Sequence, residues 1–400
     1  MYDKASIALI PSGVNDGTLY SVLPANGNGD FTHSRSLTTA TRVNKDGLIE
    51  SVAADVPRLD YPLTNGVVGN CPHLLLEPSR TNSIPYSVFD GDSPTGWAVG
   101  FGTGTFTHEL TTFRGQSAIK HTQLTTGRSY LNDSLTLATS TTYTFSMYVD
   151  LENSGDIVSN EVIAAVSITG DFGDDEVTFG EIDQNTGLVK FTFTTGTSTS
   201  CNLRIGLGAF GDTNQLNKPL IFSMPQLEVG SYPTSYIPTS GNAATRSADV
   251  CKSSGTSAEF NDSEGVLFAE ISSLANDGTI RRIAIPNTGF TALHRLEYYS
   301  TSNVIIAVTY VSPSNQVVLS HTLSDSTEFI KIAYKYKSGD FALWVNGVEV
   351  GTSVSGNLPT GLTKLNFDNG SGSNDFYGKV KQLIYFNEAL SDSELQTLTS

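Results

Sequence analysis

The fold is decided by the stretch IKIAYKYKSGDFALWVNGVEV, residues 330–350. Its first part alternates Ile and Tyr with Lys and Ala, which is the period of two expected of a strand with one face in water. Ser338-Gly339-Asp340 then turns the chain, and Asn346-Gly347 fits the type I′ turn whose twist suits a two-residue hairpin. The stretch therefore predicts a three-stranded antiparallel meander.

The same alternation occurs earlier in the chain. Apolar and polar residues alternate over residues 143–149, 189–194 and 201–207, and residues 183–187 have the composition of a hairpin turn. Strands with one wet face form antiparallel sheets, so we expect a β-sandwich or jelly roll here.

Proline-rich joints at residues 78–85 and 219–238 divide the chain into three. They predict an N-terminal extended β segment over 1–82, a jelly roll over 83–239 and a second antiparallel sandwich over 240–400. The first segment holds few apolar residues, so it should pack on the next domain or on copies of itself in an oligomer.

One short helix is expected at the C-terminus. Ser391 and Glu394 form a capping box there, ahead of Leu395 and Leu398. Glycines and prolines interrupt the rest of the chain too often for long helices. The predicted fold class is therefore all-β with a single C-terminal helix.

The chain is strongly acidic, with 40 Asp and Glu against 23 Lys and Arg and a formal charge of −17. Binding a nucleic-acid backbone requires cations that neutralise phosphates, so neither nucleic acid nor an anionic membrane surface is an expected partner. No apolar run approaches the ~20 residues that span a bilayer, and residues 1–10 lack the pattern of a signal peptide. We expect that the protein does not insert into a membrane. We also expect that it is made in the cytoplasm.

Cysteine and histidine give no sign of a metal centre. Cys71, Cys201 and Cys251 are widely spaced and odd in number, which predicts reduced, mostly buried thiols rather than disulfides or a zinc cluster. The six histidines occur singly, without metal-ligand spacing, and each is expected on the surface or packed in the interior.

The nearest approach to a catalytic motif is Glu181-Ile182-Asp183. Sandwich glucanases place two glutamates and an intervening aspartate on one strand, because two carboxylates must flank the scissile bond. Gln184 and Asn185 follow here, so the acid/base partner is missing. We expect a hairpin loop at this place and a protein that is not an enzyme.

Calcium is the one cofactor that the sequence permits. Hard oxygen ligands lie close together at Asp171, Asp174, Asp175 and Glu176, although without the spacing of a dedicated calcium loop. We expect a solvated acidic loop, with calcium as the alternative, and no other cofactor.

Aromatic side chains are the best functional signal, because a sugar stacks its apolar face on an aromatic ring while amides and carboxylates bind its hydroxyls. Trp344 lies on the opposite strand face from Phe341, Leu343 and Val345. Three interpretations stay open for it: a glycan platform, a subunit contact, or the floor under a covering loop.

Four further aromatic residues are candidates for glycan contact. Trp97 follows a loop and either plugs a sandwich, which we favour, or stacks a sugar. Tyr130, Tyr298 and Tyr299 are weaker candidates.

Short pieces of the N-terminal segment resemble a module of tailed-phage structural proteins. They include Ala40-Thr41-Arg42-Val43-Asn44, Pro57-Arg58-Leu59-Asp60-Tyr61 and Leu74-Leu75-Leu76-Glu77-Pro78-Ser79-Arg80-Thr81-Asn82. Proteins with this module typically carry a concanavalin A-like lectin/glucanase domain. The resemblance covers about the first fifth of the chain.

The remaining chain resembles two carbohydrate-binding folds. From Trp97 to Pro225-Gln226-Leu227-Glu228-Val229-Gly230 it is similar to a phage carbohydrate-binding-module jelly roll. Phe341-Ala342-Leu343-Trp344-Val345-Asn346-Gly347 and Ile384-Tyr385-Phe386-Asn387-Glu388-Ala389-Leu390-Ser391 resemble a concanavalin A/laminin-G-like sandwich. No motif transfers sugar ligands or catalysis.

The resemblance implies a non-enzymatic virion surface protein, of the capsid, tail-fibre or decoration type, that adheres to host or environmental glycans. Other virion proteins and a host surface glycan would then be its partners, and a homo-oligomer, with a trimer favoured, its state. Such a protein would assemble in the host cytoplasm and reside in the virion. The alternatives are a polysaccharide depolymerase and a structural cement protein without ligand.

Overall fold

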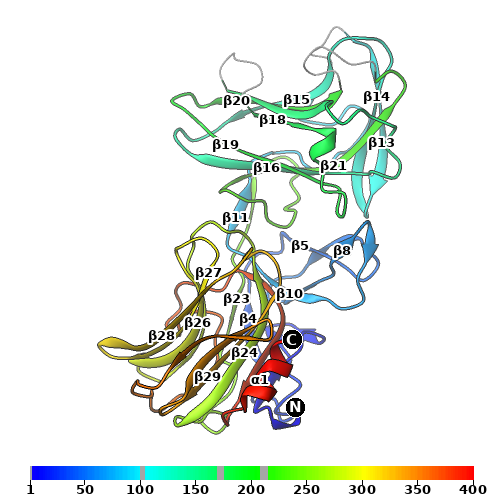
Figure 1. Cartoon of the computed structure of the whole chain (residues 1–400). Coiled ribbons are helices and arrows are strands. Elements are labelled where there is room, and N and C mark those ends of the chain that lie inside the picture. Colours follow the sequence, from blue (N-terminus) through cyan, green and yellow to red (C-terminus); the bar gives the residue numbers. More distant parts are fainter. Residues whose placement is uncertain (1, 100–103, 169–174, 208–214) are drawn as a thin grey trace.

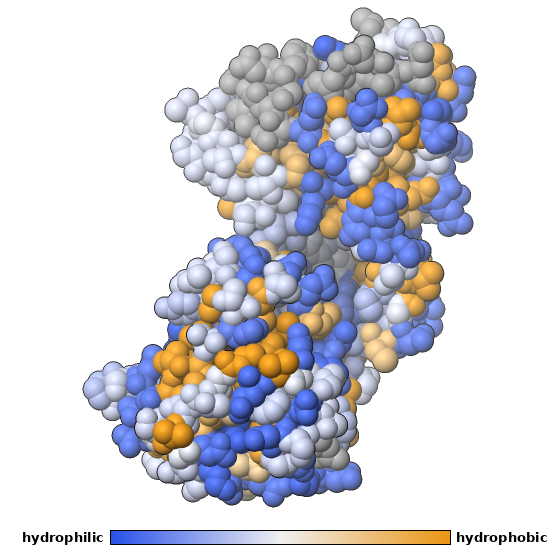
Figure 2. Space-filling model, viewed as in Figure 1, coloured by the Kyte–Doolittle hydropathy of each residue, from blue (hydrophilic) through white to orange (hydrophobic). Residues whose placement is uncertain are grey.

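The computed structural model describes residues 2–99, 104–168, 175–207 and 215–400. It is all-β, as the sequence predicts, with two antiparallel β-sandwiches placed end to end and a narrow waist between them (Figure 1). In the view of Figure 2, hydrophilic residues cover much of both halves, and hydrophobic residues are visible among them on both.

The larger sheet of the lower sandwich contains eight strands. Seven follow one another in the order β31 (Val348–Ser353), β30 (Phe341–Val345), β29 (Ile330–Lys337), β24 (Glu264–Ser273), β32 (Gly378–Phe386), β10 (His73–Leu76) and β7 (Arg58–Asp60), and β1 (Ile7–Leu9) also pairs with β32. The predicted meander is confirmed as β29, β30 and β31. Asn346 and Gly347 form its second turn with φ of 47° and 82°, the left-handed region that a type I′ turn requires.

A four-stranded sheet packs against it. Its strands, in order, are β25 (Arg281–Pro286), β26 (Ala292–Tyr298), β27 (Val304–Val311) and β28 (Ser314–Thr322). The core between the two sheets includes Leu296, Ile305, Ile332, Tyr334 and Leu383, all at most 1% exposed. Burial of such side chains contributes roughly 1.5–3 kcal/mol each.

The N-terminal segment completes this lower sandwich. It contributes β1, β7 and β10 to the large sheet, and β4 (Phe31–Ser34) pairs with β23 (Val250–Lys252). The short β2 (Val14–Asn15) and β3 (Thr18–Leu19) extend that second pairing. The apolar residues of the segment are therefore buried against the distant C-terminal part of the chain.

Two hairpins of the same segment reach toward the upper sandwich. They are β5 (Ala40–Val43) with β6 (Ile49–Val52), and β8 (Leu63–Thr64) with β9 (Val67–Val68) (Figure 1). The backbone N–H of Ile49 donates to the carbonyl of Arg114 at 2.9 Å, and the Gln116 side chain donates to the carbonyl of Ile49 at 2.7 Å.

The upper sandwich is the predicted jelly-roll-like unit. Its far sheet runs β12 (Ala98–Val99), β15 (Ser129–Thr136), β20 (Ser200–Leu207), β17 (Val162–Ile168), β18 (Asp175–Thr178). Its near sheet runs β13 (Phe106–Phe113), β14 (Gln116–Gln123), β21 (Pro219–Val229), β16 (Thr142–Val149), β19 (Leu188–Thr194). The near sheet faces the waist (Figure 1). The 3-10 turns η1 (Tyr2–Lys4) and η2 (Phe179–Glu181) are the other helical pieces described.

The chain enters and leaves the jelly roll along paired strands. β11 (Arg80–Asn82) pairs antiparallel with β22 (Ala244–Arg246), so that Asn82 lies opposite Ala244. The jelly roll is thus inserted between two halves of the lower sandwich.

A helix ends the chain, as predicted. α1 (Asp392–Thr399) is the one α-helix in the described residues, and the Glu394 carboxylate accepts from the backbone N–H of Ser391 at 2.9 Å. Leu395 and Leu398 pack on the outer face of the large sheet.

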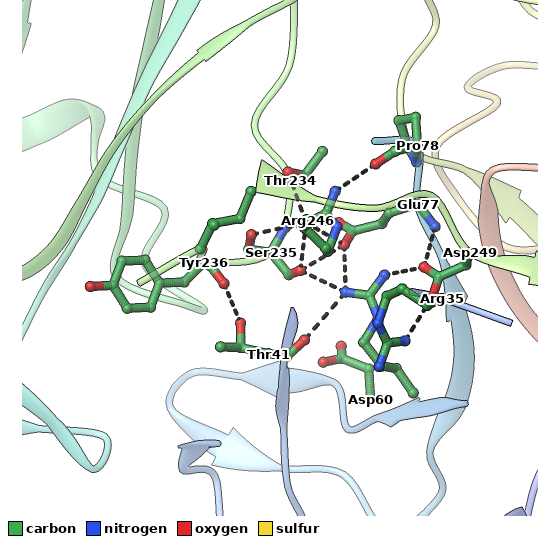
Figure 3. A network of polar contacts seen from close by, with 12 residues as sticks. Arg35, Thr41, Asp60, Glu77, Pro78, Thr234, Ser235, Tyr236, Arg246 and Asp249 are labelled. Atoms are coloured by element: carbon green, nitrogen blue, oxygen red, sulfur yellow. Dashed lines mark hydrogen bonds and ion pairs between the residues drawn. The ribbon is translucent and has the colours of Figure 1, made fainter. Parts of the chain in front are cut away.

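Five charged side chains form a buried ionic cluster that we call the clamp: Arg35, Arg58, Glu77, Arg246 and Asp249. Figure 3 shows this network from close by. Arg58 pairs with Glu77 at 2.6 Å and also with Asp249, while Arg246 reaches Glu77 at 3.0 Å and Arg35 reaches Asp249 at 2.9 Å. The five side chains are at most 3% exposed. Their charges join the N-terminal segment to the strands that follow the jelly roll.

The clamp holds its carboxylates ionised. Burial alone would raise the pKa of Glu77, but the positive charges of Arg246 and Arg58 outweigh it and lower that pKa to about 2. Burial would also raise the pKa of the Asp249 carboxyl. The charges of Arg58 and Arg35, together with a contact from His33 at 3.3 Å, outweigh burial and hold that pKa far below its usual range.

Candidate functional site

Trp344 is buried and does not offer a stacking face. It lies on the outer face of the large sheet, as its parity predicts, but α1 covers it and leaves it 7% exposed beside Leu395 and Leu398. It is the floor under a covering element, and that element is a helix rather than a loop.

Trp97 and Tyr298 also lie in cores. Trp97 is 6% exposed, packs on Phe89 and donates its Nε1–H to the carbonyl of Tyr86 at 2.8 Å, so it plugs the jelly roll. Tyr298 is 4% exposed between the two lower sheets. Its neighbour Tyr299 is 42% exposed and remains open to solvent.

Tyr130 lies on the outer face of the far sheet of the jelly roll, beneath a guanidinium group. The Cζ of Arg204 is 5.2 Å from the centre of its ring, and Arg204 Nε is 3.4 Å from the Asn132 side-chain oxygen. Ser134 donates to Asn202 at 2.7 Å further along the same face. Tyr130, Asn132 and Arg204 are each less than 9% exposed, so only the Ser134 end of this row is accessible.

The acidic residues proposed for calcium are only partly covered by the structure. Asp171 and Asp174 lie outside the described residues, Asp175 begins β18, and Glu176 is exposed on that strand. Within the described ranges, no group of three or more His, Cys, Asp or Glu side chains is placed to hold a metal ion. No cysteine forms a disulfide: Cys71 is exposed, and Cys201 and Cys251 are buried.

Glu181 and Asp183 both serve local turns. The Glu181 carboxylate accepts from the backbone and hydroxyl of Thr178 at 2.8 and 2.9 Å. Asp183 accepts from the Asn185 backbone at 2.8 Å and the Thr186 hydroxyl at 2.9 Å. The expected turn at residues 183–187 is present.

This turn lines a cavity of about 700 Å³ that we call the hairpin cavity. Its walls come from residues 46–48, 65–66 and 68 of the two N-terminal hairpins and from residues 113–114, 149–152, 184–185 and 187 of the jelly roll. Ligand pockets commonly measure roughly 300–1,000 Å³. The cavity is therefore large enough for an oligosaccharide.

Backbone contacts fix the two sides of the hairpin cavity. The N–H of Asn65 donates to the Asn185 side chain at 3.2 Å, and that of Gly66 donates to the Asn185 carbonyl at 2.9 Å. Gly187 has φ of 70°, and a Cβ there would lie 2.3 Å from the Val149 carbonyl oxygen. Only glycine therefore lets this turn approach β16 so closely.

The polar lining of the hairpin cavity consists of three carboxylates, three amides and one arginine: Asp46, Asp150, Glu152, Asn65, Gln184, Asn185 and Arg114. Asp150 is committed to its own turn, where its carboxylate accepts from the backbones of Glu152 and Asn153 at 3.2 and 3.1 Å. Asp46 and Glu152 are exposed, and Asp46 is paired with Lys45 at 2.9 Å. Because a carboxylate oxygen accepts more than one bond, both side chains can still accept bonds from a ligand.

Arg114 stacks at one wall, with its Cζ 5.0 Å from the centre of the Phe113 ring and 5.7 Å from that of Tyr148. Burial lowers the pKa of Arg114, against the opposing effects of Tyr148 and Asp150. An arginine nevertheless stays charged at neutral pH. The lining therefore carries more negative than positive charge.

Sequence reasoning missed this cavity. The composition of residues 183–187 indicates a turn, and the sequence Lys45-Asp46-Gly47 is also typical of one, but the two are far apart in the chain. Nothing in either turn indicates that the two meet, since their meeting depends on the way the jelly roll sits on the N-terminal hairpins.

A scan against protein-family models found no match to the sequence, and a search of curated proteins found none either. Among the described residues, no helix is long and apolar enough to cross a membrane.

Solved structures with some likeness include a carbohydrate-binding module and a pair of laminin domains. The carbohydrate-binding module of a Ruminococcus gnavus sialidase bound to sialyllactose is 14% identical over 35% of this chain and 84% of its own, with a TM-score of 0.31. The mouse laminin α1 domains LG4-5 are 10% identical over 64% of this chain and 88% of theirs, with a TM-score of 0.25.

A Trypanosoma rangeli sialidase is 11% identical over 92% of this chain and 81% of its own, with a TM-score of 0.28. At such identities and TM-scores, these likenesses assign neither a ligand nor a reaction to this chain.

Proposed function

We propose that the chain is a non-enzymatic glycan-binding protein and that the hairpin cavity holds an uncharged oligosaccharide. The observation that carries the proposal is the composition of this cavity, where amides and carboxylates surround an apolar wall. Sugar hydroxyls bind such polar groups, and the C–H faces of a sugar pack on such walls.

The charge of the lining favours an uncharged ligand. Asp46, Asp150 and Glu152 line the cavity, and the opposing cations are Arg114 and Lys45, which pairs with Asp46. An acidic sugar placed there would be repelled by the excess of carboxylates, whereas the hydroxyls of a neutral sugar would donate to them.

Binding to an array of neutral and acidic polysaccharides, followed by calorimetry with a positive neutral oligosaccharide, tests this proposal. Replacing Asp46 and Glu152 together by Ala removes two exposed acceptors and should weaken binding about tenfold or more, with the fold intact. Glu349→Ala, an exposed carboxylate on β31, is the matched control and should leave affinity unchanged.

Two outcomes would reject the proposal. An array without a neutral glycan hit would remove the function itself. Affinity that survives the double replacement but is lost when Ser134 and Asn202 become Lys would move the site to the far sheet of the jelly roll.

A glycoside hydrolase is the second candidate, because Asp46 and Glu152 are exposed carboxylates in one cavity. Hydrolysis requires a pair of carboxyl groups on opposite sides of the scissile bond. We expect no release of reducing ends from any array-positive polysaccharide. Release that disappears in Glu152→Gln would establish the enzyme instead.

The resemblance of the N-terminal segment supports a further part of the proposal, that the protein is a trimer carried on a phage particle. Light scattering should then give three times the chain mass, and gold-labelled antibody should decorate particles. A glycan-silent protein whose deletion destabilises particles would instead be a structural cement protein.

A further inference from the structure

The outer face of the four-stranded sheet carries a second pocket, of about 230 Å³. Arg282 and Arg295 line it together with Phe290, Tyr310 and Asn369. It lies on the lower sandwich and shares no lining residue with the hairpin cavity.

The two arginines share a single carboxylate oxygen. Nε of Arg282 and Nε of Arg295 lie 2.7 and 2.8 Å from the same Oε2 of Glu297, which is 1% exposed. Arg282 is directly opposite Glu297 across the strands, and Arg295 is two residues before Glu297 on β26. The shared carboxylate fixes both guanidinium groups side by side.

Each guanidinium uses only its Nε in these bonds. Throughout the described part of the chain, no acceptor bonds to the terminal nitrogens of Arg282 or Arg295. The side chains of Arg282 and Arg295 are 18% and 13% exposed. Their terminal N–H groups are therefore held at the pocket and do not extend freely into solvent. Two cations around one buried anion leave a local positive charge.

The surroundings add a third cation and a ring. Lys364 Nζ lies 5.2 Å from the centre of the Phe290 ring, and Phe290 is 40% exposed at the pocket mouth. Two carboxylates lie nearby: Asp368 accepts from the backbone N–H of Gly370, and Asp375, which forms an isolated β-bridge with Arg282, accepts from the Tyr377 hydroxyl at 3.2 Å. Two arginines on one carboxylate oxygen are unusual in a chain with a formal charge of −17.

We propose that this pocket binds an anionic saccharide, with the paired guanidinium groups on its carboxylate or sulfate and Phe290 and Tyr310 against its ring. Planar guanidinium forks bind such oxyanions through parallel N–H bonds. The ligand class is opposite in charge to that of the hairpin cavity.

Affinity electrophoresis of the full chain in polygalacturonate, dextran sulfate and neutral dextran tests the inference. We expect retardation by at least one polyanion, weakened by added salt, and none by dextran. Retardation by polygalacturonate alone identifies a carboxylate ligand, and retardation by dextran sulfate alone identifies a sulfate ligand.

Arg295→Gln removes one of the two guanidinium groups and leaves the Arg282–Glu297 pair in place. It should reduce the association constant for the polyanion about tenfold. Phe290→Ser, which touches no ion pair, should reduce it as well, so a folding defect in the first variant leaves the inference testable. Lys45→Gln, an exposed cation outside the pocket, is the control.

Binding of neither polyanion, or equal binding by wild type and both pocket variants, would overturn this inference. Replacing Asp46 and Glu152 by Ala should not change polyanion binding. The inference and the neutral-glycan proposal can therefore fail separately.

Discussion

At the scale of single residues, Asp133 is the clearest exception to the alternation of apolar and polar residues along the strands, because a carboxyl group occupies a position that faces the core. It lies between Leu131 and Leu135 on β15, on the face that these two residues bury in the jelly-roll core, and is 8% exposed. Burial raises its pKa to about 6, with only a backbone hydrogen bond in opposition. A charge at this place is therefore a cost to the folded state.

We predict that Asp133→Asn stabilises the protein at pH 7 by roughly 1–3 kcal/mol. The folded carboxyl titrates near 6 and the unfolded one near 4, so the folded state binds the extra proton between these values. Stability falls as pH rises through that window, and the penalty is complete above it. Urea unfolding should show the gain at pH 7 and little gain at pH 4.

The exposed Asp16→Asn is the control for this prediction, with a change within ~0.5 kcal/mol. A gain for Asp133→Asn that is equal at both pH values would show that packing, and not ionisation, is responsible.

The alternation of residues along a strand predicts the sheet face on which a side chain lies. It does not predict which element packs over that face. Trp344 is on the outer face as the alternation predicts, and α1 then buries it. His108 and His121 likewise occur singly in the sequence, yet β13 and β14 bring their Nε2 and Nδ1 within 2.8 Å. Such contacts depend on strand register, which no local pattern contains.

At the scale of elements, the clamp shows what several N-terminal motifs do. Arg58 and Glu77 belong to the pieces that resemble phage structural proteins, and both are buried in this cluster. Arg58 and Glu77 therefore hold strands of the lower sandwich together. The sequence indicated the strands and turns, but not that charged residues would lie at the joint.

We predict that Arg58→Met destabilises the protein by roughly 3–5 kcal/mol, because Glu77 and Asp249 lose their shared partner while still buried. Chemical denaturation at pH 7 measures this. Lys45→Met, which breaks the exposed pair with Asp46, should cost less than ~1 kcal/mol. Equal effects of the two variants would show that the clamp contributes no more than a surface ion pair.

At the scale of the whole molecule, the N-terminal segment and the C-terminal region form one folding unit. β1 and β10 both pair with β32, and Leu74 and Leu76 lie in the same core as Leu383. The sequence left open what the segment packs on. Pairing across more than 300 residues is set by tertiary structure, which explains why composition alone could not identify it.

We predict that residues 240–400 expressed alone do not fold, because they lack three strands of the large sheet. Joining Asn82 to Ala244 by a short Gly-Ser linker, without the jelly roll, should restore a folded sandwich, since these two residues are opposite each other across β11 and β22. Circular dichroism and a cooperative melt distinguish the two chains. Cooperative unfolding of 240–400 alone would refute the shared fold.

The proposed function requires that the hairpin cavity bind a neutral glycan. A crystal structure of the full chain with the neutral oligosaccharide selected on the array tests it most directly. We predict sugar rings in the hairpin cavity, with hydroxyls on Asp46 and Glu152 and an intact glycosidic bond. Sugar bound elsewhere with this cavity empty, or a cleaved product within it, would contradict a non-enzymatic glycan site in this cavity.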